Sequence, residues 1–291
     1  MLDAIGLILR VFSPRPDLIE SNVASVKSAV DRALTGAPFR RVDILISADS
    51  RFGDSDCGGT AFALRRTFGQ ARPGYRSVFV SEVTKGDIYC GLLNYGIATQ
   101  VRHGVDYSVI LSSGVQSYAT PETFGAMGEA AGNGARVIGV VVDELSESIR
   151  AGRIANTFAM WHNVSLMAVG GFDLRAAKPR KDDRLARYLR GWSREQKEKD
   201  GNGEVFYNFA GVEEIIPLVR LIDTYGPCIA PIVPQGAVKQ WVTPDPVSNP
   251  EGYARHLKKL GTKFERQAAF AAMERVDLSF LKGGVMPEYR T

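Results

Sequence analysis

The sequence predicts an α/β protein in which a mostly parallel sheet is flanked by helices. Two short, almost continuously apolar runs, residues 4–12 and 107–111, are typical of strands that are covered on both faces. Segments with apolar residues at helical spacing alternate with such runs through about residue 143. This alternation favours parallel strands that are joined by right-handed crossovers.

Length and composition are those of an ordinary globular protein. The 291 residues carry a net charge of +4, with 45% hydrophobic and 23% charged residues. The mild charge weakly favours an anionic small ligand or a membrane surface. Because no nucleic-acid reader motif accompanies the charge, we expect no nucleic-acid partner.

The cysteines and the N-terminus predict a soluble, cytoplasmic protein. Cys57, Cys90 and Cys228 are too few and too far apart for a disulfide framework or a zinc site, which indicates a reducing compartment. The N-terminus has an early acid in place of a basic stretch, and no apolar run reaches the roughly 18 residues of a membrane span.

The first half of the chain reads as alternating strands and helices. Pro14 and Pro16 end the first strand, and Asp17 with Glu20 forms a capping box that opens a helix. A second strand at 42–48 leads into an Asp-, Ser- and Gly-rich loop. A short basic helix at 60–68 and a third strand at 77–83 follow.

The stretch 86–115 combines a helix with a buried strand and predicts a ligand site. Its helix places Leu92, Leu93 and Ile97 on one face, and the strand 107–111 is rich in β-branched residues. The small polar residues 112–114 follow that strand. Open α/β sheets bind their ligands at the carboxyl ends of strands.

The second half contains further helices, two more strands and a basic region. Thr120, Pro121 and Glu122 make a helix start. The remaining predicted elements are a strand at 136–142, an apolar helix-like segment at 156–173, a basic loop or helix at 174–208, an edge strand at 228–234 and a C-terminal helix after 250.

Two adjacent acids open a further helix. Pro217 fits only in the first turn of a helix, so this helix begins at about Glu213 or Glu214. The positive end of the helix dipole favours the ionised carboxylate that a general base needs. Acids at a helix start are also common as purely structural residues.

Three motifs in this order resemble family 2 glycosyltransferases of the GT-A fold. The first is Asn94-Tyr95-Gly96-Ile97-Ala98 followed by the strand that ends at Leu111. The second, Gly170-Gly171-Phe172-Asp173, is similar to the acceptor-side element, and Glu213-Glu214 is similar to the Glu-Asp motif. The resemblance covers roughly residues 4–235. It implies a GT-A nucleotide-sugar binding domain at 1–243 and a C-terminal helical extension at 244–291.

The resemblance assigns roles to individual residues. Glu214 would be the catalytic base beside Glu213, and Asp49 would receive the nucleotide base. The remaining implied residues are Asp54, Asn94, Ser112 and Ser113 around the nucleotide, and Trp161, His162, Gly171 and Asp173 on the acceptor side. A scaffold role for Asn94 and a core role for Trp161 stay open alternatives.

The chain departs from the family at the metal-binding Asp-x-Asp motif, where it has Ser112 and Gly114. Hydroxyls are poor substitutes for carboxylates as metal ligands, so the sequence predicts no metal site there. Mn or Mg would need ligands from the loop with Asp49, Asp54 and Asp56. Otherwise Lys85 or the basic cluster at 175–199 would replace the metal, or turnover has been lost.

The leading hypothesis is therefore an inverting transfer of a sugar from a UDP- or GDP-sugar to a glycan or small hydroxyl acceptor. The alternative is a catalytically silent protein of the same fold that binds a nucleotide, a glycan or a protein. A sugar-phosphate nucleotidyltransferase is disfavoured because no glycine-rich basic loop follows the first strand. A peripheral membrane contact and a homo-oligomer stay open.

Overall fold

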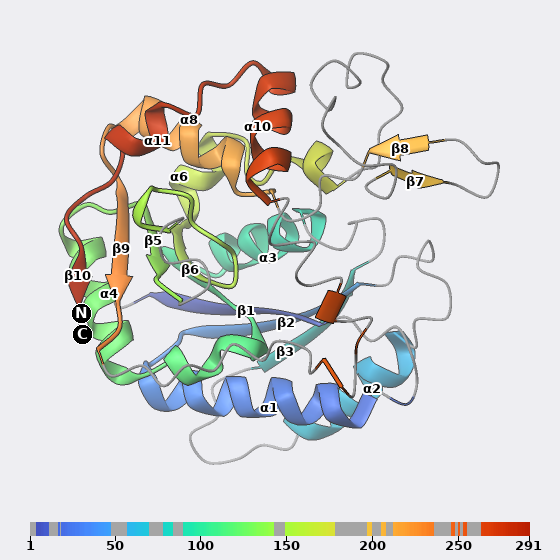
Figure 1. The fold of residues 1–291 in the computed structure, drawn as a ribbon. Helices are drawn as coiled ribbons and strands as arrows, with labels where there is room; N and C mark the ends of the chain where they lie inside the picture. Colours follow the sequence, from blue (N-terminus) through green and yellow to red (C-terminus); the bar gives the residue numbers. More distant parts are fainter. Residues whose placement is uncertain are drawn as a thin grey trace.

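The computed structural model confirms an α/β fold with a mostly parallel sheet between layers of helices (Figure 1). It describes residues 4–11, 17, 19–47, 57–69, 78–83, 90–142, 149–177, 197–199, 205–207, 212–235, 246–247, 250, 253–254 and 263–291. The described residues form an eight-stranded sheet in the order β10-β9-β5-β6-β4-β1-β2-β3.

Seven of the eight strands have at least one parallel neighbour, while β6 runs antiparallel to both β4 and β5. The strands are β1 (Ile5–Val11), β2 (Arg41–Ser47), β3 (Val78–Val83), β4 (Tyr107–Leu111), β5 (Val137–Val140), β6 (Phe158–His162), β9 (Ile229–Val233) and β10 (Tyr289–Arg290). A separate antiparallel pair is formed by β7 (Lys197–Lys199) and β8 (Val205–Tyr207).

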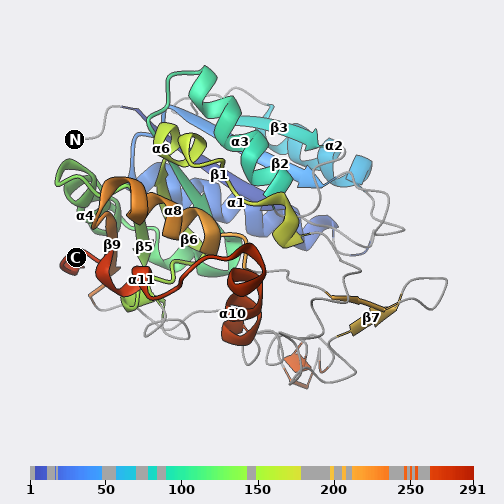
Figure 2. The same ribbon diagram turned by 90° about the horizontal axis from the view of Figure 1, so that it is seen from above.

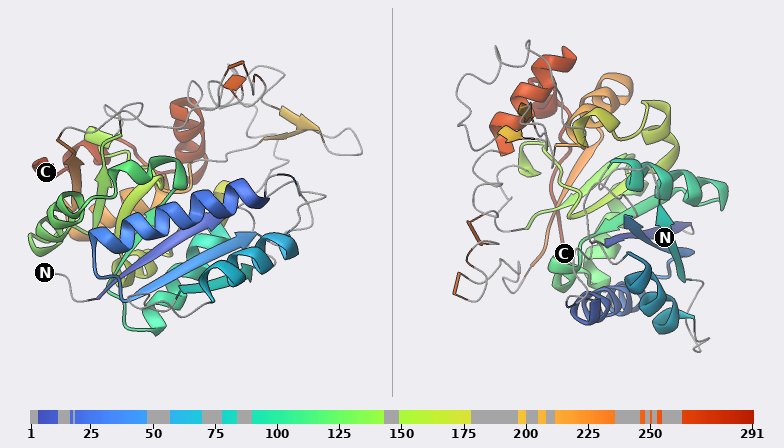
Figure 3. Two further views of the ribbon diagram at one scale, coloured as in Figure 1. Left: turned by 90° about the horizontal axis from the view of Figure 1, so that it is seen from below. Right: turned by 90° about the vertical axis from the view of Figure 1, so that its right-hand side faces the viewer.

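Helices cover both faces of the sheet (Figures 1 and 3). On one face lie α1 (Ile19–Gly36), α2 (Cys57–Phe68) and α4 (Pro121–Gly132). On the other lie α3 (Cys90–Arg102), α6 (Asn163–Ala168), α8 (Ile215–Tyr225) and α10 (Lys263–Glu274). There are also three short helices: η3 (Ser113–Tyr118), η5 (Leu174–Ala177) and α11 (Phe280–Gly283).

Local sequence signals account for several of these boundaries. The Thr120 side chain accepts a hydrogen bond of 3.2 Å from the backbone N–H of Thr123, and Pro121 opens α4, as predicted. Gly226 ends α8 with a φ of +72°, a conformation that favours glycine.

The segment 156–173 was predicted to be helix-like, and this prediction is wrong for its first part. Residues 158–162 form β6, and only residues 163–168 are helical. Because β6 lies between β4 and β5 and is covered on both faces, its residues are almost uniformly apolar. Uniform hydrophobicity does not distinguish a buried strand from a buried helix.

The C-terminal residues join the core of the rest of the chain. Helices α10 and α11 lie beside α8 (Figure 2), and Phe270 and Leu281 belong to the same hydrophobic core as the sheet. β10 pairs with β9, so β9 is the second strand from that edge, while the sequence analysis expected it at the edge itself.

The core contains a closed polar network between α3 and the sheet, which we call the Gln100 network. Gln100 donates from Nε2 to the Leu7 carbonyl (3.0 Å) and to Asp43 Oδ2 (3.2 Å). Its Oε1 accepts from Ser108 Oγ (2.5 Å). Arg41 completes the set by donating to both oxygens of Asp43 at 2.8–3.0 Å.

Cys90 and Cys228 are buried free thiols, and burial raises the pKa of Cys228 to about 11. In the part of the chain that the structure describes, no helix has the length and apolar character to cross a membrane.

Candidate functional site

The candidate site lies where the strand order reverses. From β1 the chain continues to β2 and β3 on one side, whereas β4 lies on the other side of β1. Such a switch point opens a crevice beyond the carboxyl ends of the two strands. Arg10 lies near the end of β1, and the register that pairs Leu9 with Leu111 places it next to Ser112.

Arg10 connects this edge of the sheet to the acidic start of α8. Its guanidinium Nη1 lies 3.5 Å from Glu213 Oε1, and its Nη2 donates to the Asn156 carbonyl at 3.3 Å. The ion pair places the predicted catalytic acids at the same edge as Ser112. In the sequence, Arg10 is a charged residue near the carboxyl end of an otherwise apolar strand, which is a signal that could have identified it. No role was predicted for it.

Glu214 immediately precedes α8 and is paired with the C-terminal helix. Lys263 Nζ donates to Glu214 Oε1 at 3.1 Å. Burial raises the pKa of Glu214, Lys263 opposes that rise, and the neighbouring Glu213 carboxylate adds to it. The arrangement is a buried acid held beside one cation.

Arg153 and Gln267 extend this arrangement on the side of α10. Arg153 Nη1 donates to Gln267 Oε1 at 2.8 Å, and its guanidinium lies 5.0 Å from the centre of the Phe264 ring. Gln267 is one helical turn beyond Lys263 on α10. The indole N–H of Trp161 donates to Asn156 Oδ1 at 2.9 Å.

These contacts, together with the Glu213–Glu214 peptide bond and the helical turn from Lys263 to Gln267, link a set of side chains that we call the polar ring. Its members are buried or partly buried. They are Arg10, Arg153, Asn156, Glu213, Glu214, Lys263 and Gln267. Two amide donors in it, Asn156 Nδ2 and Gln267 Nε2, are buried and have no hydrogen-bond partner among the described residues.

The predicted nucleotide residues fall into three groups. Asp49 and Asp54 lie outside the described residues, as do Asp56 and Lys85. Ser112 and Ser113 lie at the predicted edge of the sheet, where the Ser112 N–H donates to the Thr157 carbonyl at 2.7 Å.

Asn94 is the third group, and its amide is engaged with the protein backbone. Its Nδ2 donates to the Phe172 carbonyl (2.8 Å), and its Oδ1 accepts from the Phe172 N–H (2.9 Å). The neighbouring Gly171 has a φ of +70°, and a Cβ there would lie 2.7 Å from Asn94 Oδ1. Asn94 therefore holds the turn that leads to Asp173, which corresponds to the scaffold alternative.

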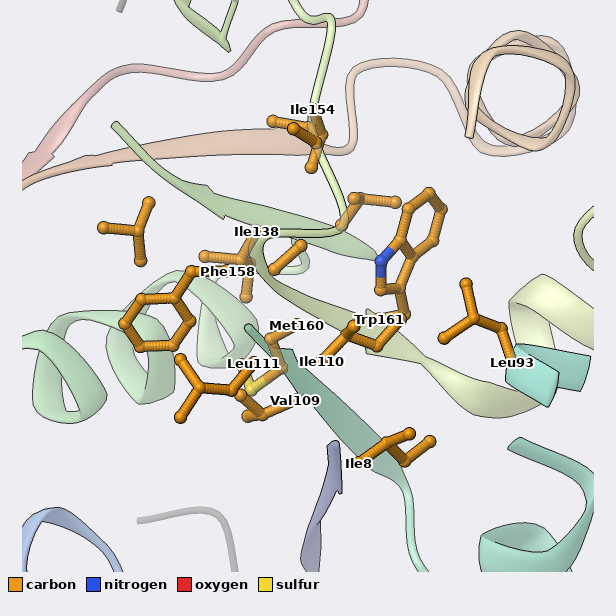
Figure 4. Packing of buried hydrophobic residues seen from close by; sticks show 14 of the residues in the cluster. Ile8, Leu93, Val109, Ile110, Leu111, Ile138, Ile154, Phe158, Met160 and Trp161 are labelled. Atoms are coloured by element: carbon orange, nitrogen blue, oxygen red, sulfur yellow. The ribbon is translucent and has the colours of Figure 1, made fainter. Parts of the chain in front are cut away.

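Two predicted acceptor-side residues have structural contacts of their own. Trp161 is fully buried and packs in the core near Leu93 and Ile154 (Figure 4), with its ring centroid 5.0 Å from that of Phe172. The ring packs against Phe172 and the indole N–H is bonded to Asn156, which corresponds to the core alternative for Trp161.

His162 lies at the opposite edge of the sheet, because β6 is antiparallel to β4 and His162 pairs with Tyr107. Its Nδ1 caps α6 by accepting from the Ser165 N–H at 3.2 Å. Burial is the main cause that lowers the pKa of His162, which favours the neutral ring that accepts this bond. His162 therefore lies at the amino end of β4, apart from Ser112, and its role on the acceptor side stays a prediction.

The described residues at the site do not fit a divalent metal. Ser112 and Ser113 offer hydroxyls, and no group of three His, Cys, Asp or Glu residues in the described part of the chain could hold a metal ion. In the polar ring, each carboxylate is already paired with an organic cation.

A cavity of about 610 Å³ lies on the other face of the sheet, between the end of α1 and α4. Its lining is apolar apart from Glu129 and includes Ile5, Phe124 and Met160. None of the predicted site residues lines it, so the cavity and the chemistry lie on different faces.

Comparison with known proteins gives distant matches among solved structures. The sequence matches no protein-family model and no curated protein. Among 27 matching solved chains is the mannosyltransferase PcManGT of Pyrobaculum calidifontis in complex with GDP-mannose and Mn2+. It is 15% identical with a TM-score of 0.41, over 94% of this chain and 76% of that one.

A second match is a protein of Mycobacterium tuberculosis, 14% identical with a TM-score of 0.32 over 49% of this chain and 68% of that one. Likenesses at this level carry no argument about function, which therefore depends on the geometry of the site.

Proposed function

We propose that this chain is a GT-A-type glycosyltransferase that transfers a sugar from a nucleotide-sugar donor to a hydroxyl acceptor. One observation carries the proposal: the Arg10–Glu213 ion pair holds the acidic start of α8 at the switch point between β1 and β4. Nucleotides bind at such switch points. An acid at this position can take the proton of an attacking hydroxyl.

The proposed reaction inverts the anomeric carbon. The acceptor oxygen attacks this carbon while its proton passes to the Glu214 carboxylate. The bond between the anomeric carbon and the diphosphate oxygen breaks, and its electron pair leaves with the nucleoside diphosphate. Burial raises the pKa of Glu214, which makes it a better proton acceptor, and Lys263 favours the ionised form before the reaction.

The acceptor hydroxyl would take the place of Lys263 beside Glu214, because the carboxylate is otherwise covered. Glu213 stays paired with Arg10 and holds the start of α8 in position. This division gives the two adjacent acids different roles.

The test is the Glu214→Gln variant, which keeps the side-chain shape and removes the base. Transfer from a panel of UDP- and GDP-sugars to hydroxyl acceptors should fall by ~10²–10⁴-fold, with donor binding by calorimetry little changed. The matched control is Glu288→Gln, which changes an exposed acid paired with Arg150 at 2.8 Å. An unchanged transfer rate in Glu214→Gln would exclude Glu214 as the base.

The burial of the acids favours a second candidate, a protein of the same fold that binds a nucleotide-sugar without chemistry. Glu213 and Glu214 are both covered by cations in the described conformation. Donor binding without release of nucleoside diphosphate, with any acceptor of the panel, would support this candidate over the enzyme.

A further inference from the structure

We propose that the polar ring binds the diphosphate of the nucleotide-sugar donor directly, through cationic and amide side chains, without a bridging metal ion. This inference rests on the proposed function and adds the groups that recognise the donor's charge. Arg10, Arg153, Lys263, Asn156 and Gln267 would make the contacts.

The cations of the ring are its more accessible members. Arg10 is 21% exposed and its partner Glu213 is 6% exposed. Lys263 is 13% exposed and its partner Glu214 is 2% exposed. In both pairs the carboxylate lies deeper than the cation, so an approaching anion meets guanidinium and ammonium groups first.

The charge balance of the ring also favours an anion. Its charged members are three cations, Arg10, Arg153 and Lys263, and the two acids Glu213 and Glu214, so their formal sum is +1. Guanidinium groups match phosphate oxygens with two parallel donors, and charge-assisted bonds of this kind are strong.

Two buried amides supply further donors. Asn156 Nδ2 and Gln267 Nε2 have no acceptor among the described residues, although the oxygen of each amide is already bonded within the fold, to Trp161 and Arg153 respectively. These oxygen contacts direct the N–H₂ groups away from their partners. A buried donor without an acceptor is costly, and a diphosphate oxygen would satisfy it.

The departing diphosphate needs positive charge in the transition state, and this role normally falls to a metal ion. Ser112 and Ser113 do not fit a metal, whereas Arg10 of the ring places permanent positive charge next to Ser112. The ring therefore supplies positive charge at this edge of the sheet, where the serine hydroxyls do not hold a metal ion.

The test is calorimetric titration of the full chain with UDP, GDP and inorganic pyrophosphate, in EDTA and in Mn²⁺. We expect the same dissociation constant within about twofold in both buffers, and displacement of the bound nucleotide by pyrophosphate. Gln267→Met and Lys263→Met should weaken binding by about 10-fold, the cost of one or two lost hydrogen bonds to a charged group. Arg150→Gln, which alters an exposed ion pair with Glu288, is the matched control and should bind as the wild type does.

The outcomes separate this inference from the proposed function. Nucleotide binding that requires Mn²⁺ would overturn the metal-free ring and leave the glycosyltransferase proposal intact. Metal-free binding that is equal in wild type, Gln267→Met and Lys263→Met would place the diphosphate elsewhere and also overturn it. Absence of binding to every nucleotide and nucleotide-sugar in either buffer would remove the proposed function itself.

Discussion

Two buried polar clusters lie on the same face of the sheet, and they differ in how completely their groups are paired. In the Gln100 network, both ends of the Gln100 amide are bonded, and Asp43 accepts from Arg41 and Gln100. In the polar ring, Gln267 is equally buried, yet its Nε2 has no partner among the described residues.

The difference separates a structural cluster from a candidate binding site. A buried network in which each donor finds an acceptor fixes the packing of α3 on the sheet and offers nothing to a ligand. The ring leaves donors without acceptors at a sheet edge where ligands bind. Such unpaired donors lower the stability of the fold, as is typical of functional sites. The same Gln→Met substitution should therefore mainly lower stability in the Gln100 network and mainly weaken nucleotide binding in the polar ring.

The largest expected effect is the contrast between Gln100→Met and Gln267→Met. Both change a fully buried glutamine into an apolar side chain of similar size. Gln100→Met leaves Ser108 and the Leu7 carbonyl without their bonds to Gln100 and should lower the free energy of unfolding by about 3 kcal/mol. Gln267→Met loses the bond to Arg153 and removes an unpaired donor, so about 1 kcal/mol or less is expected.

Urea denaturation of the two variants measures this contrast, and calorimetry with UDP and GDP adds the functional half. Gln267→Met should bind nucleotide more weakly, whereas folded Gln100→Met should bind as the wild type does. Equal destabilisation of the two variants would show that the two clusters do not differ in pairing.

A smaller effect is expected from Gly6→Ala, which tests how rigid the Gln100 network is. A Cβ on Gly6 would lie 2.1 Å from Gln100 Oε1, and three hydrogen bonds hold that amide in place. We expect a loss of ~1–3 kcal/mol in denaturation experiments, typical of overpacking. The control is Gly125→Ala in α4, where nothing lies within 4 Å of the added Cβ and a gain of about 0.5–1 kcal/mol is expected from helix propensity. A stability of Gly6→Ala equal to that of the wild type would mean that the network yields easily.

Much of the fold could be predicted from local sequence patterns. The strands that became β1, β2, β3 and β4 are short apolar runs with clear ends, and Thr120 with Pro121 marked the start of α4. Pro217 placed the start of α8 within a residue or two. Each of these signals is formed by residues that are close together in the sequence, so it can be recognised without the structure.

The candidate site was predicted only in part, because tertiary contacts assemble it. The edge with Ser112 and the acids Glu213 and Glu214 followed from strand ends and a helix start. Lys263 and Gln267 join them from a helix about 50 residues later, and no local pattern indicates that contact. The position of His162 at the far edge could not be predicted, because the direction of β6 depends on sheet pairing.

The smallest expected effect is a pH dependence that originates in the ring. Burial raises the folded-state pKa of Glu214 above its ordinary value of 4.5, with Lys263 opposing and Glu213 adding to the rise. The folded state therefore holds a proton over a pH range in which the unfolded state has released it. This contribution to stability is present below pH 4.5 and is lost as the pH rises through the folded-state pKa.

Urea denaturation between pH 4 and 8 tests this dependence, with Glu214→Gln as the variant that cannot titrate. The unfolding free energy of the wild type minus that of Glu214→Gln should fall as the pH rises above 4.5 and then level off. In a Lys263→Met background the fall should extend to higher pH, because the cation that opposes the raised pKa has been removed. A difference that is flat or rises with pH would show that Glu214 is ionised at least as easily in the folded ring as in the unfolded chain, and would contradict the dominance of burial over the Lys263 pairing.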